Sequence, residues 1–294
     1  MVTNELKQRV IAALAEQRVN FSGTDKKFAT SKGLNPSAYN RIKNGETERV
    51  IADSIWISLA RKLEVPIGNI QEWKTAETPV YKFIMSSLAM CQINSASRLL
   101  CDIPDIGKTF SARAYVKQNR NAVYVDCSQN KTRQKLIRAI AKEFGVGYTG
   151  RIGDVYEDLV FYLRSLPNPL IILDEAGDLE YNAFLELKAL WNATERCVGW
   201  YMMGADGLKH KIRKSIDAKK VGYAELFSRF GSRYLKLSPD GSDALKEFKT
   251  IHAAVIIKAN MPNANGNIQT MIVGSDYSLR RIETEIRKHA GLTV

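Results

Sequence analysis

The feature that most constrains this chain lies at residues 98–109, where a short apolar segment runs into a tight loop and then into a helix that opens on Gly107-Lys108-Thr109. This order matches the end of the phosphate-binding template G-x-x-x-x-G-K-[ST], in which backbone N–H groups and the lysine hold phosphates and the hydroxyl holds Mg²⁺. The first glycine of the template is Asp102 here, and Asp105 occupies another position that is commonly glycine. The motif is therefore altered and needs an independent match.

A second segment supplies that match. Residues 169–175 form an aliphatic run that ends in Asp174-Glu175, as in a buried central strand that delivers two carboxylates to the carboxyl edge of a sheet. Beside such a template, the aspartate holds Mg²⁺ through its water shell, and the glutamate orients or deprotonates the attacking water. The spacing fits two intervening strand–helix units. Together the segments predict a nucleotide site in which Lys108 meets phosphate and Thr109 and Asp174 hold Mg²⁺.

Composition limits the class of protein and its partners. The 294 residues have room for one medium domain and a smaller one, and a hydrophobic content of 45% supports packed cores. The net charge of +12 favours a polyanionic partner. The four cysteines stand alone, and no histidine completes a zinc set. No signal peptide or membrane-spanning stretch is present, so we expect a reduced, cytoplasmic protein that contacts no membrane.

The N-terminal part shows the pattern of a small helical unit. Apolar residues recur at helical spacing over 3–17 and again over 51–63. Between them, two short helices meet at Gly33; Asn35 caps the second, which ends at Asn44-Gly45. This pattern resembles the repressor-type helix-turn-helix, with a helical protein-docking module as the alternative. In the DNA-binding interpretation, major-groove and phosphate contacts come from the second helix, through Ser37, Asn40, Arg41 and Lys43.

The rest of the chain predicts an α/β fold followed by a helical lid. Short apolar strands alternate with helices, which argues for a parallel sheet with helices on both faces. The expected strands are 98–101, 122–126, 169–173, 199–204 and 234–237, and the expected helical segments include 81–93, 179–195, 206–230, 242–258 and 276–290, the last two connected through a turn at 262–266. We expect four parts: a helix-turn-helix domain at 1–66, a linker at 67–80, an α/β core at 81–239 and a lid at 240–294.

At this level the chain resembles an AAA+ ATPase, and more narrowly the phage Mu B transposition protein and transposon regulator ATPase family. Residues 99–114 align with the family's strand, P-loop and helix, and residues 170–187 look like its I-I-D-E-A-D stretch and the helix that follows. The resemblance places Asp206 where the family has a polar sensor, usually Asn. It also implies an arginine finger at Arg229, within L-F-S-R-F, with Arg233 as the reserve, and a lid sensor at Arg280.

The resemblance implies ATP and Mg²⁺ as cofactors and a P-loop AAA+ core. The implied nucleotide contacts come from the loop, a strand end and the lid: Asp105, Ile106, Gly107, Lys108, Thr109, Phe110, Asp206 and Arg280. The implied catalytic residues are Glu175, Asp174 and Arg229. Carboxylates at Asp102 and Asp105 would lie close to polyphosphate charge, which is unfavourable at low dielectric, unless Asp102 points away. We therefore expect slow hydrolysis, with ATP binding without turnover as the alternative.

The family's activity implies a function for the whole chain. ATP-bound subunits would assemble head to tail as a ring or helical filament on double-stranded DNA and would recruit or activate a DDE-type transposase. The core residues expected to contact DNA phosphates are Lys131, Arg133 and Arg151. One rival is a DNA-binding regulator with a degenerate, non-hydrolysing nucleotide site. Another is a helicase loader or replication-initiation ATPase, which would share the same core.

Overall fold

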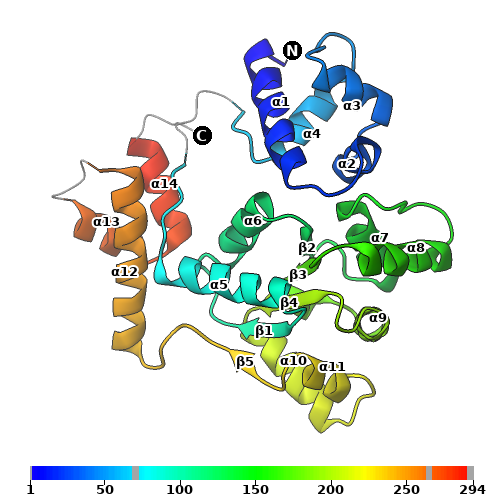
Figure 1. Ribbon diagram of the computed structural model, residues 1–294. Coiled ribbons are helices and arrows are strands. Elements are labelled where there is room, and N and C mark those ends of the chain that lie inside the picture. Colours follow the sequence, from blue (N-terminus) through cyan, green and yellow to red (C-terminus); the bar gives the residue numbers. More distant parts are fainter. Residues whose placement is uncertain (1, 68–72, 263–266, 290–294) are drawn as a thin grey trace.

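The computed structural model describes residues 2–67, 73–262 and 267–289. Figure 1 shows a helical N-terminal part, a central sheet covered by helices, and a helical C-terminal part. Each part has its own apolar core among the described residues. The exact division of the chain at 66, 80 and 239 stays a prediction. No helix in the described ranges is long and apolar enough to cross a membrane.

The centre of the molecule is a parallel five-stranded sheet of order β2-β3-β4-β1-β5. Its strands are β1 (Ser97–Cys101), β2 (Ala122–Asp126), β3 (Leu170–Asp174), β4 (Gly199–Gly204) and β5 (Tyr234–Leu235). Every residue of β3 and β4 is buried, as expected for parallel strands covered on both faces. Because β4 lies between β1 and β3, the loops that follow β1 and β3 meet at the same edge of the sheet.

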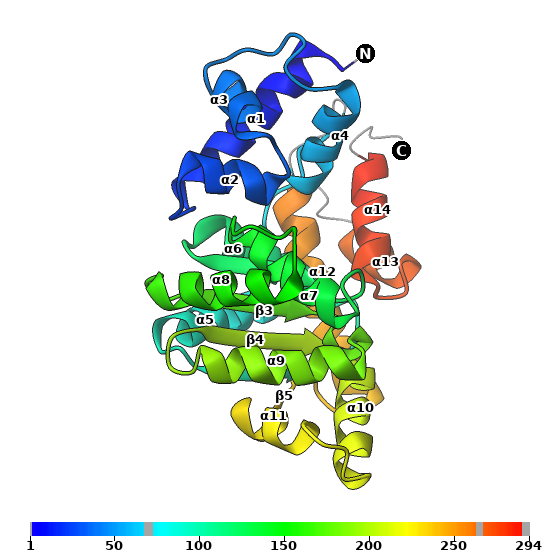
Figure 2. The same cartoon turned by 90° about the vertical axis from the view of Figure 1, so that its right-hand side faces the viewer.

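Two layers of helices cover the sheet, as the alternation of strands and helices predicts. On one face lie α5 (Pro79–Ile93) and α6 (Lys108–Gln118), packed on alternate strand residues such as Leu100 and Ile172. The other face packs against α7 (Arg133–Glu143), α8 (Ile152–Ser165), α9 (Tyr181–Ala193), α10 (Asp206–Asp217) and α11 (Tyr223–Arg229). Figure 2 shows α9 in front of β4, with α5 on the far side. The predicted α/β class is confirmed.

The N-terminal part contains four helices, as predicted: α1 (Asn4–Val19), α2 (Asp25–Lys32), α3 (Pro36–Lys43) and α4 (Asp53–Lys62). Gly33 has a left-handed φ of 76° between α2 and α3, and the Asn35 side chain accepts a hydrogen bond from the Ser37 N–H. Phe28 and Trp56 are fully buried among these helices. Local capping signals thus determine where α2 ends and where α3 begins.

The C-terminal part differs from the prediction of two helical stretches. It contains α12 (Ser242–Asn260), α13 (Ile268–Gly274) and α14 (Leu279–His289), packed around Ile257, Ile272 and Ile282. The short helix α13 was not predicted, because seven residues span too few helical turns for a periodic apolar pattern to be recognised. Helix α14 begins at Leu279 rather than 276, since Asp276 and Tyr277 have positive φ angles. Most of the expected turn at 262–266 lies outside the described residues.

Other boundaries also differ from the expected ranges. The expected strand 234–237 pairs only at Tyr234 and Leu235, because the N–H groups of Leu237 and Ser238 bind the Asp102 carboxylate instead of extending the ladder. Helix α5 begins at Pro79, which the Thr78 side chain caps, rather than at 81. The expected helix 179–195 begins at Tyr181, after a 3₁₀ turn at Ala176–Asp178. The segment 206–230 forms two helices, α10 and α11.

A close backbone contact supports the start of β4 and gives a test of the fold. A Cβ atom added at Gly199 would lie only 2.8 Å from the carbonyl carbon of Cys91, at the end of α5. We expect Gly199→Ala to lower the free energy of unfolding by about 2 kcal/mol or more, measured by urea denaturation. Gly207→Ala is the control, since a Cβ there meets nothing within 4 Å; equal effects of the two changes would contradict the packing described.

Candidate nucleotide-binding site

The loop between β1 and α6 has the geometry of an anion-binding turn. Gly107 has a φ of 90°, and a Cβ added there would meet nothing within 4 Å. Helix α6 begins at the next residue, so its first N–H groups face the loop, where a helix N-terminus favours negative charge. Ile106 is buried in the core under the loop, while Phe110 is exposed, with its ring centroid 6.4 Å from that of Tyr81. The chain thus forms the cradle that the G-K-T sequence predicts.

Lys108 lies across this loop instead of extending into solvent. Its ammonium group donates hydrogen bonds to the carbonyl oxygens of Asp102, at 2.9 Å, and Ile103, at 2.6 Å. The side chain is buried, and this burial lowers its pKa, while the nearby carboxylates of Asp102 and Asp174 act in the opposite direction. A positive charge is therefore held at the mouth of the loop, bonded to two carbonyls that a phosphate group can replace.

Thr109 and Asp174 meet although they are far apart in the sequence. The Thr109 hydroxyl donates to Oδ2 of Asp174 at 2.6 Å, and Oδ1 of Asp174 accepts a bond from the Glu175 N–H at 2.9 Å. Asp174 is only 1% exposed. A hydroxyl and a carboxylate side by side next to a phosphate cradle are a donor set that suits Mg²⁺, which binds through few protein oxygens together with substrate phosphates and water. The residues present therefore fit the ion that the sequence predicts.

Glu175 follows β3 in a conformation that is uncommon for its residue type. Its φ is 49°, in the left-handed region, and its side chain is exposed at the same sheet edge. Partial desolvation, and then the neighbouring Asp174, raise the pKa of its carboxyl group. A carboxylate with raised basicity, directed to solvent beside the cradle, is suited to accept a proton from water.

Asp102, the residue in place of the first template glycine, points away from the cradle. Its side chain is fully buried, and it accepts hydrogen bonds from the N–H groups of Leu237 and Ser238, the Ser238 hydroxyl and the Ile103 N–H. The structure therefore matches the stated alternative for Asp102, whose carboxylate points away from the phosphate cradle. The reason is that four donors, three of them from the segment leading to the lid, compensate its charge.

Asp105 contacts the lid. Its Oδ2 accepts a hydrogen bond from the Ser278 hydroxyl at 2.7 Å, and its Oδ1 accepts one from the Arg280 N–H, at the start of α14, at 3.3 Å. The Arg280 guanidinium lies 3.9 Å from the same carboxylate, with its side chain 84% exposed. The structure thus brings the lid arginine beside the loop. Asp206 is exposed at the start of α10, directly beyond the end of β4 and so between the two halves of the site.

Arg229 does not reach the site of its own chain. Its Nε atom donates to the Asn192 side chain at 2.7 Å, and its guanidinium lies over the Trp191 ring. Trp191 in turn donates to Ser97, at the first position of β1, so Arg229 lies near the amino edge of the sheet, opposite the loop. Arg233, the reserve candidate, is exposed just before β5, near the same edge.

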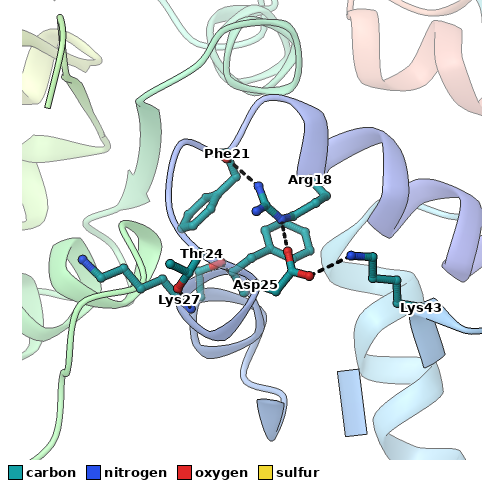
Figure 3. A network of polar contacts seen from close by, with 8 residues as sticks. Arg18, Phe21, Thr24, Asp25, Lys27 and Lys43 are labelled. Atoms are coloured by element: carbon teal, nitrogen blue, oxygen red, sulfur yellow. Dashed lines mark hydrogen bonds and ion pairs between the residues drawn. The ribbon is translucent and has the colours of Figure 1, made fainter. Parts of the chain in front are cut away.

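The predicted DNA-binding residues are exposed but lie in separate places. Ser37, Asn40, Arg41 and Lys43 share α3, where Arg41 pairs with Glu46 and Lys43 with Asp25. Figure 3 shows Asp25 held between Arg18 and Lys43, and these two partners lower its pKa. In the core, Lys131 pairs with Asp178 at 2.9 Å and Arg133 with Glu186 at 2.8 Å. Arg151 is exposed at the N-cap of α8.

Sequence reasoning missed Tyr124, which the structure places in the site. Its hydroxyl donates to Oδ2 of Asp174 at 2.9 Å from the neighbouring strand β2. In the register, Tyr124 lies opposite Ile172 and Asp126 opposite Asp174. The available signal was its position in the predicted strand 122–126, on the face that it shares with the strand's last residue, Asp126.

The fold and this site together match the P-loop class of nucleotide-binding proteins. A family model described as an AAA domain matches residues 99–212, which run from β1 into α10. The chain is moreover similar to transposition proteins of phage Mu and of a Mu-like prophage. The Mu-like prophage FluMu DNA transposition protein B of Haemophilus influenzae is 26% identical over 231 residues, which cover 77% of this chain and 76% of that protein. The ATP-dependent target DNA activator B of Escherichia phage Mu is 27% identical over 225 residues, which cover 73% and 68%.

Solved structures include two similar proteins. The Aeropyrum pernix ORC1 protein in complex with DNA matches with a TM-score of 0.46 and 22% identity, covering 61% of this chain and 50% of that one. The Walker-type ATPase PABY2304 of Pyrococcus abyssi matches with a TM-score of 0.45 and 14% identity, covering 73% and 76%.

The contacts of Asp102 predict that restoring the glycine of the phosphate-binding template at this position destabilises the protein. Asp102→Gly restores the template glycine but leaves the N–H groups of Leu237 and Ser238, the second of them buried, without their acceptor. We expect it to lower the free energy of unfolding by about 3 kcal/mol, measured by urea denaturation. Asp276→Gly makes the same change at an exposed position with a φ of 52°, where glycine is favoured, and should be neutral or stabilising. Similar stabilities for the two variants would show that Asp102 does not anchor that segment.

Proposed function

We propose that this chain is an ATP-dependent, DNA-binding AAA+ ATPase that assembles on target DNA and recruits or activates a DDE transposase. The observation that carries the proposal is the relationship to two proteins named for DNA transposition and for ATP-dependent activation of target DNA, over about three quarters of this chain. Within the shared region, the structure brings Lys108, Thr109 and Asp174 together at one edge of the sheet. The alternative functions do not account for both observations.

The proposed chemistry follows from the contacts of the site. The phosphates of ATP would lie at residues 102–108 and the start of α6, where Lys108 exchanges its carbonyl partners for phosphate oxygens. Thr109 and Asp174 would hold Mg²⁺, which neutralises phosphate charge. Glu175 would orient the attacking water and accept its proton, and Asp206 would contact the phosphate from the end of β4.

Asp105 supports the expectation of slow hydrolysis. Its carboxylate lies in the loop itself, so phosphate charge must be accommodated beside it, or its bonds to Ser278 and Arg280 must reorganise. The same bonds place Arg280 where it can compensate the added negative charge. We infer that ATP binding and the position of the lid are linked, and that turnover is slow because this contact has to change in each cycle.

The position of Arg229 supports an arrangement in which it acts on the nucleotide site of a neighbouring subunit. A residue near the edge opposite its own loop can complete a site only in a neighbouring subunit. Repetition of this head-to-tail contact would give a ring or a helical filament, in which Arg229 stabilises charge on the phosphate of the next subunit. Arg233 would be its substitute from the same edge.

The DNA contacts would come from two basic surfaces. Residues 1–66 would form the DNA-binding domain, with α3 presenting Ser37, Asn40 and Arg41 to the groove. The second surface lies on the α/β core and comprises Lys131, Arg133 and Arg151. Most of these cations pair with carboxylates, as do Arg41 with Glu46 and Lys131 with Asp178. DNA phosphate would replace such exposed, weak pairs, so binding should fall steeply with salt.

A DNA-binding regulator with a non-hydrolysing site is the second candidate. The bonds that tie Asp102 to the segment after β5 and Asp105 to Ser278 of the lid favour it, because they also suit a loop used only for structure. Glu175 argues against it, since a structural site needs no exposed carboxylate directly after Asp174 at the edge of the sheet.

One experiment separates these functions. ATP hydrolysis is measured with and without duplex DNA for the unchanged protein, Lys108→Ala and Glu175→Gln, together with co-sedimentation of DNA. We expect DNA to stimulate hydrolysis in the unchanged protein, and we expect each substitution to reduce it by about 100-fold or more. Glu175→Gln should still assemble on DNA in the presence of ATP, because it keeps the binding residues, whereas Lys108→Ala should not.

The rival outcome is equally clear. DNA binding that does not depend on ATP or on Lys108, with no hydrolysis above that of Lys108→Ala, would support the regulator and contradict the ATPase. Thermal denaturation of each variant serves as the control for folding.

A further inference from the structure

Asp174 is a buried carboxylate held in part by a residue that no motif predicts. Of its two oxygens, Oδ1 is fixed by the Glu175 N–H, whereas Oδ2 accepts bonds from the hydroxyl groups of both Thr109 and Tyr124. When Thr109 becomes a ligand of Mg²⁺, its hydroxyl has to reorient toward the ion. The Tyr124 hydroxyl comes from the middle of strand β2 and does not have to move. It is therefore the side-chain donor that can hold Oδ2 in place before and after the ion binds.

Tyr124 is itself held by α6, the helix that follows the loop. The guanidinium of Arg113 lies over the Tyr124 ring, 5.0 Å from its centroid. Arg113 is one helical turn beyond Thr109, and Lys117 is one turn further, so these three side chains form one stripe along α6. That stripe contacts Asp174, Tyr124 and the N-terminal part in succession.

The third contact is made by Glu64, which follows α4 of the N-terminal part. Its Oε1 lies 3.3 Å from Arg113, and its Oε2 pairs with Lys117. The Asn20 side chain donates to the Lys117 carbonyl oxygen at 2.6 Å, so the N-terminal part contacts the end of α6 at two points. Figure 1 shows α6 lying between helices α1–α4 and the sheet. Because the Glu64 pairs are partly exposed, they add little to stability. Their effect is to orient the side chains of Arg113 and Lys117 on α6.

We propose that Tyr124 is a positioning residue for the Mg²⁺ ligand Asp174, and that Arg113 and Glu64 connect this carboxylate to the N-terminal part. This inference rests on the proposed use of ATP with Mg²⁺. Partners of metal-binding carboxylates orient them and tune their affinity for the ion. The Glu64–Arg113–Tyr124 series therefore makes the affinity of the site for Mg²⁺ depend on how the helix-turn-helix part docks on α6.

The first test uses Tyr124→Phe, which removes one hydroxyl group and leaves the ring under Arg113. Binding of mant-ATP, a fluorescent ATP derivative, is titrated with Mg²⁺ present and with EDTA. We expect the gain in mant-ATP affinity that Mg²⁺ gives to fall by about tenfold, while the affinity in EDTA stays the same. Tyr115→Phe is the matched control, because its hydroxyl bonds Gln92 on the same face of the sheet and does not touch Asp174. It should leave the Mg²⁺ dependence unchanged.

The second test concerns the connection to the N-terminal part. Glu64→Gln should reduce the gain in mant-ATP affinity that Mg²⁺ gives by about threefold, as expected for loss of a partly exposed ion pair. In a Tyr124→Phe background it should have no further effect, because the two residues act in series. Glu143→Gln removes a different ion pair between the two parts, with Lys62, and should have no effect on Mg²⁺.

The outcomes distinguish this inference from the proposed function. If the unchanged protein binds no mant-ATP, the proposed function fails, and the positioning role fails with it. If it binds mant-ATP with Mg²⁺ but Tyr124→Phe behaves like Tyr115→Phe, or loses binding equally in EDTA, only the positioning role is overturned. Additive effects of Glu64→Gln and Tyr124→Phe would overturn the connection through Arg113.

Discussion

The hydrogen bond between the Thr109 hydroxyl and the Asp174 carboxylate joins the two halves of the candidate site, and much of the fold serves to make it possible. The two residues follow different strands, β1 and β3, which pair on either side of β4. Because all three strands are parallel, their carboxyl ends meet at one edge, and the loops that follow them are brought together. The apolar packing of α5 and α6 on one face and α7 to α9 on the other fixes this register. The site is a consequence of that arrangement.

The two aspartates of the loop show how an altered motif is accommodated. Asp102 is turned into the protein, where donors from the segment after β5 compensate its charge, so that it anchors the base of the lid. Asp105 stays in the loop and accepts bonds from the start of α14. Glycine gives a loop freedom and close approach to phosphate. Here the two aspartates restrict the loop but connect it to the segment after β5 and to the start of α14.

Much of the fold could be predicted from the sequence, because it depends on local signals. The positions of β2 and β4 follow from apolar runs, and the ends of α2 and α3 follow from Gly33 and Asn35. Lys108, Thr109 and Asp174 could be predicted to converge because strand ends meet in a parallel sheet. The direction of the Asp102 side chain could not, since it depends on Leu237 and Ser238, more than a hundred residues away. The same distant contact shortens β5, and the role of Tyr124 depends on a pairing register that no local pattern fixes.

The most direct measurement is calorimetric titration of a non-hydrolysable ATP analogue with Mg²⁺, without DNA, into the unchanged protein and into Lys108→Ala. If the loop is a working phosphate cradle, the unchanged protein should bind one analogue per chain. Lys108→Ala should then bind at least about tenfold more weakly, because a buried, charged hydrogen-bond donor has been lost, while it still unfolds cooperatively. An unchanged protein that binds no analogue, or a folded Lys108→Ala with the same affinity, would contradict the assignment of this loop as the nucleotide site.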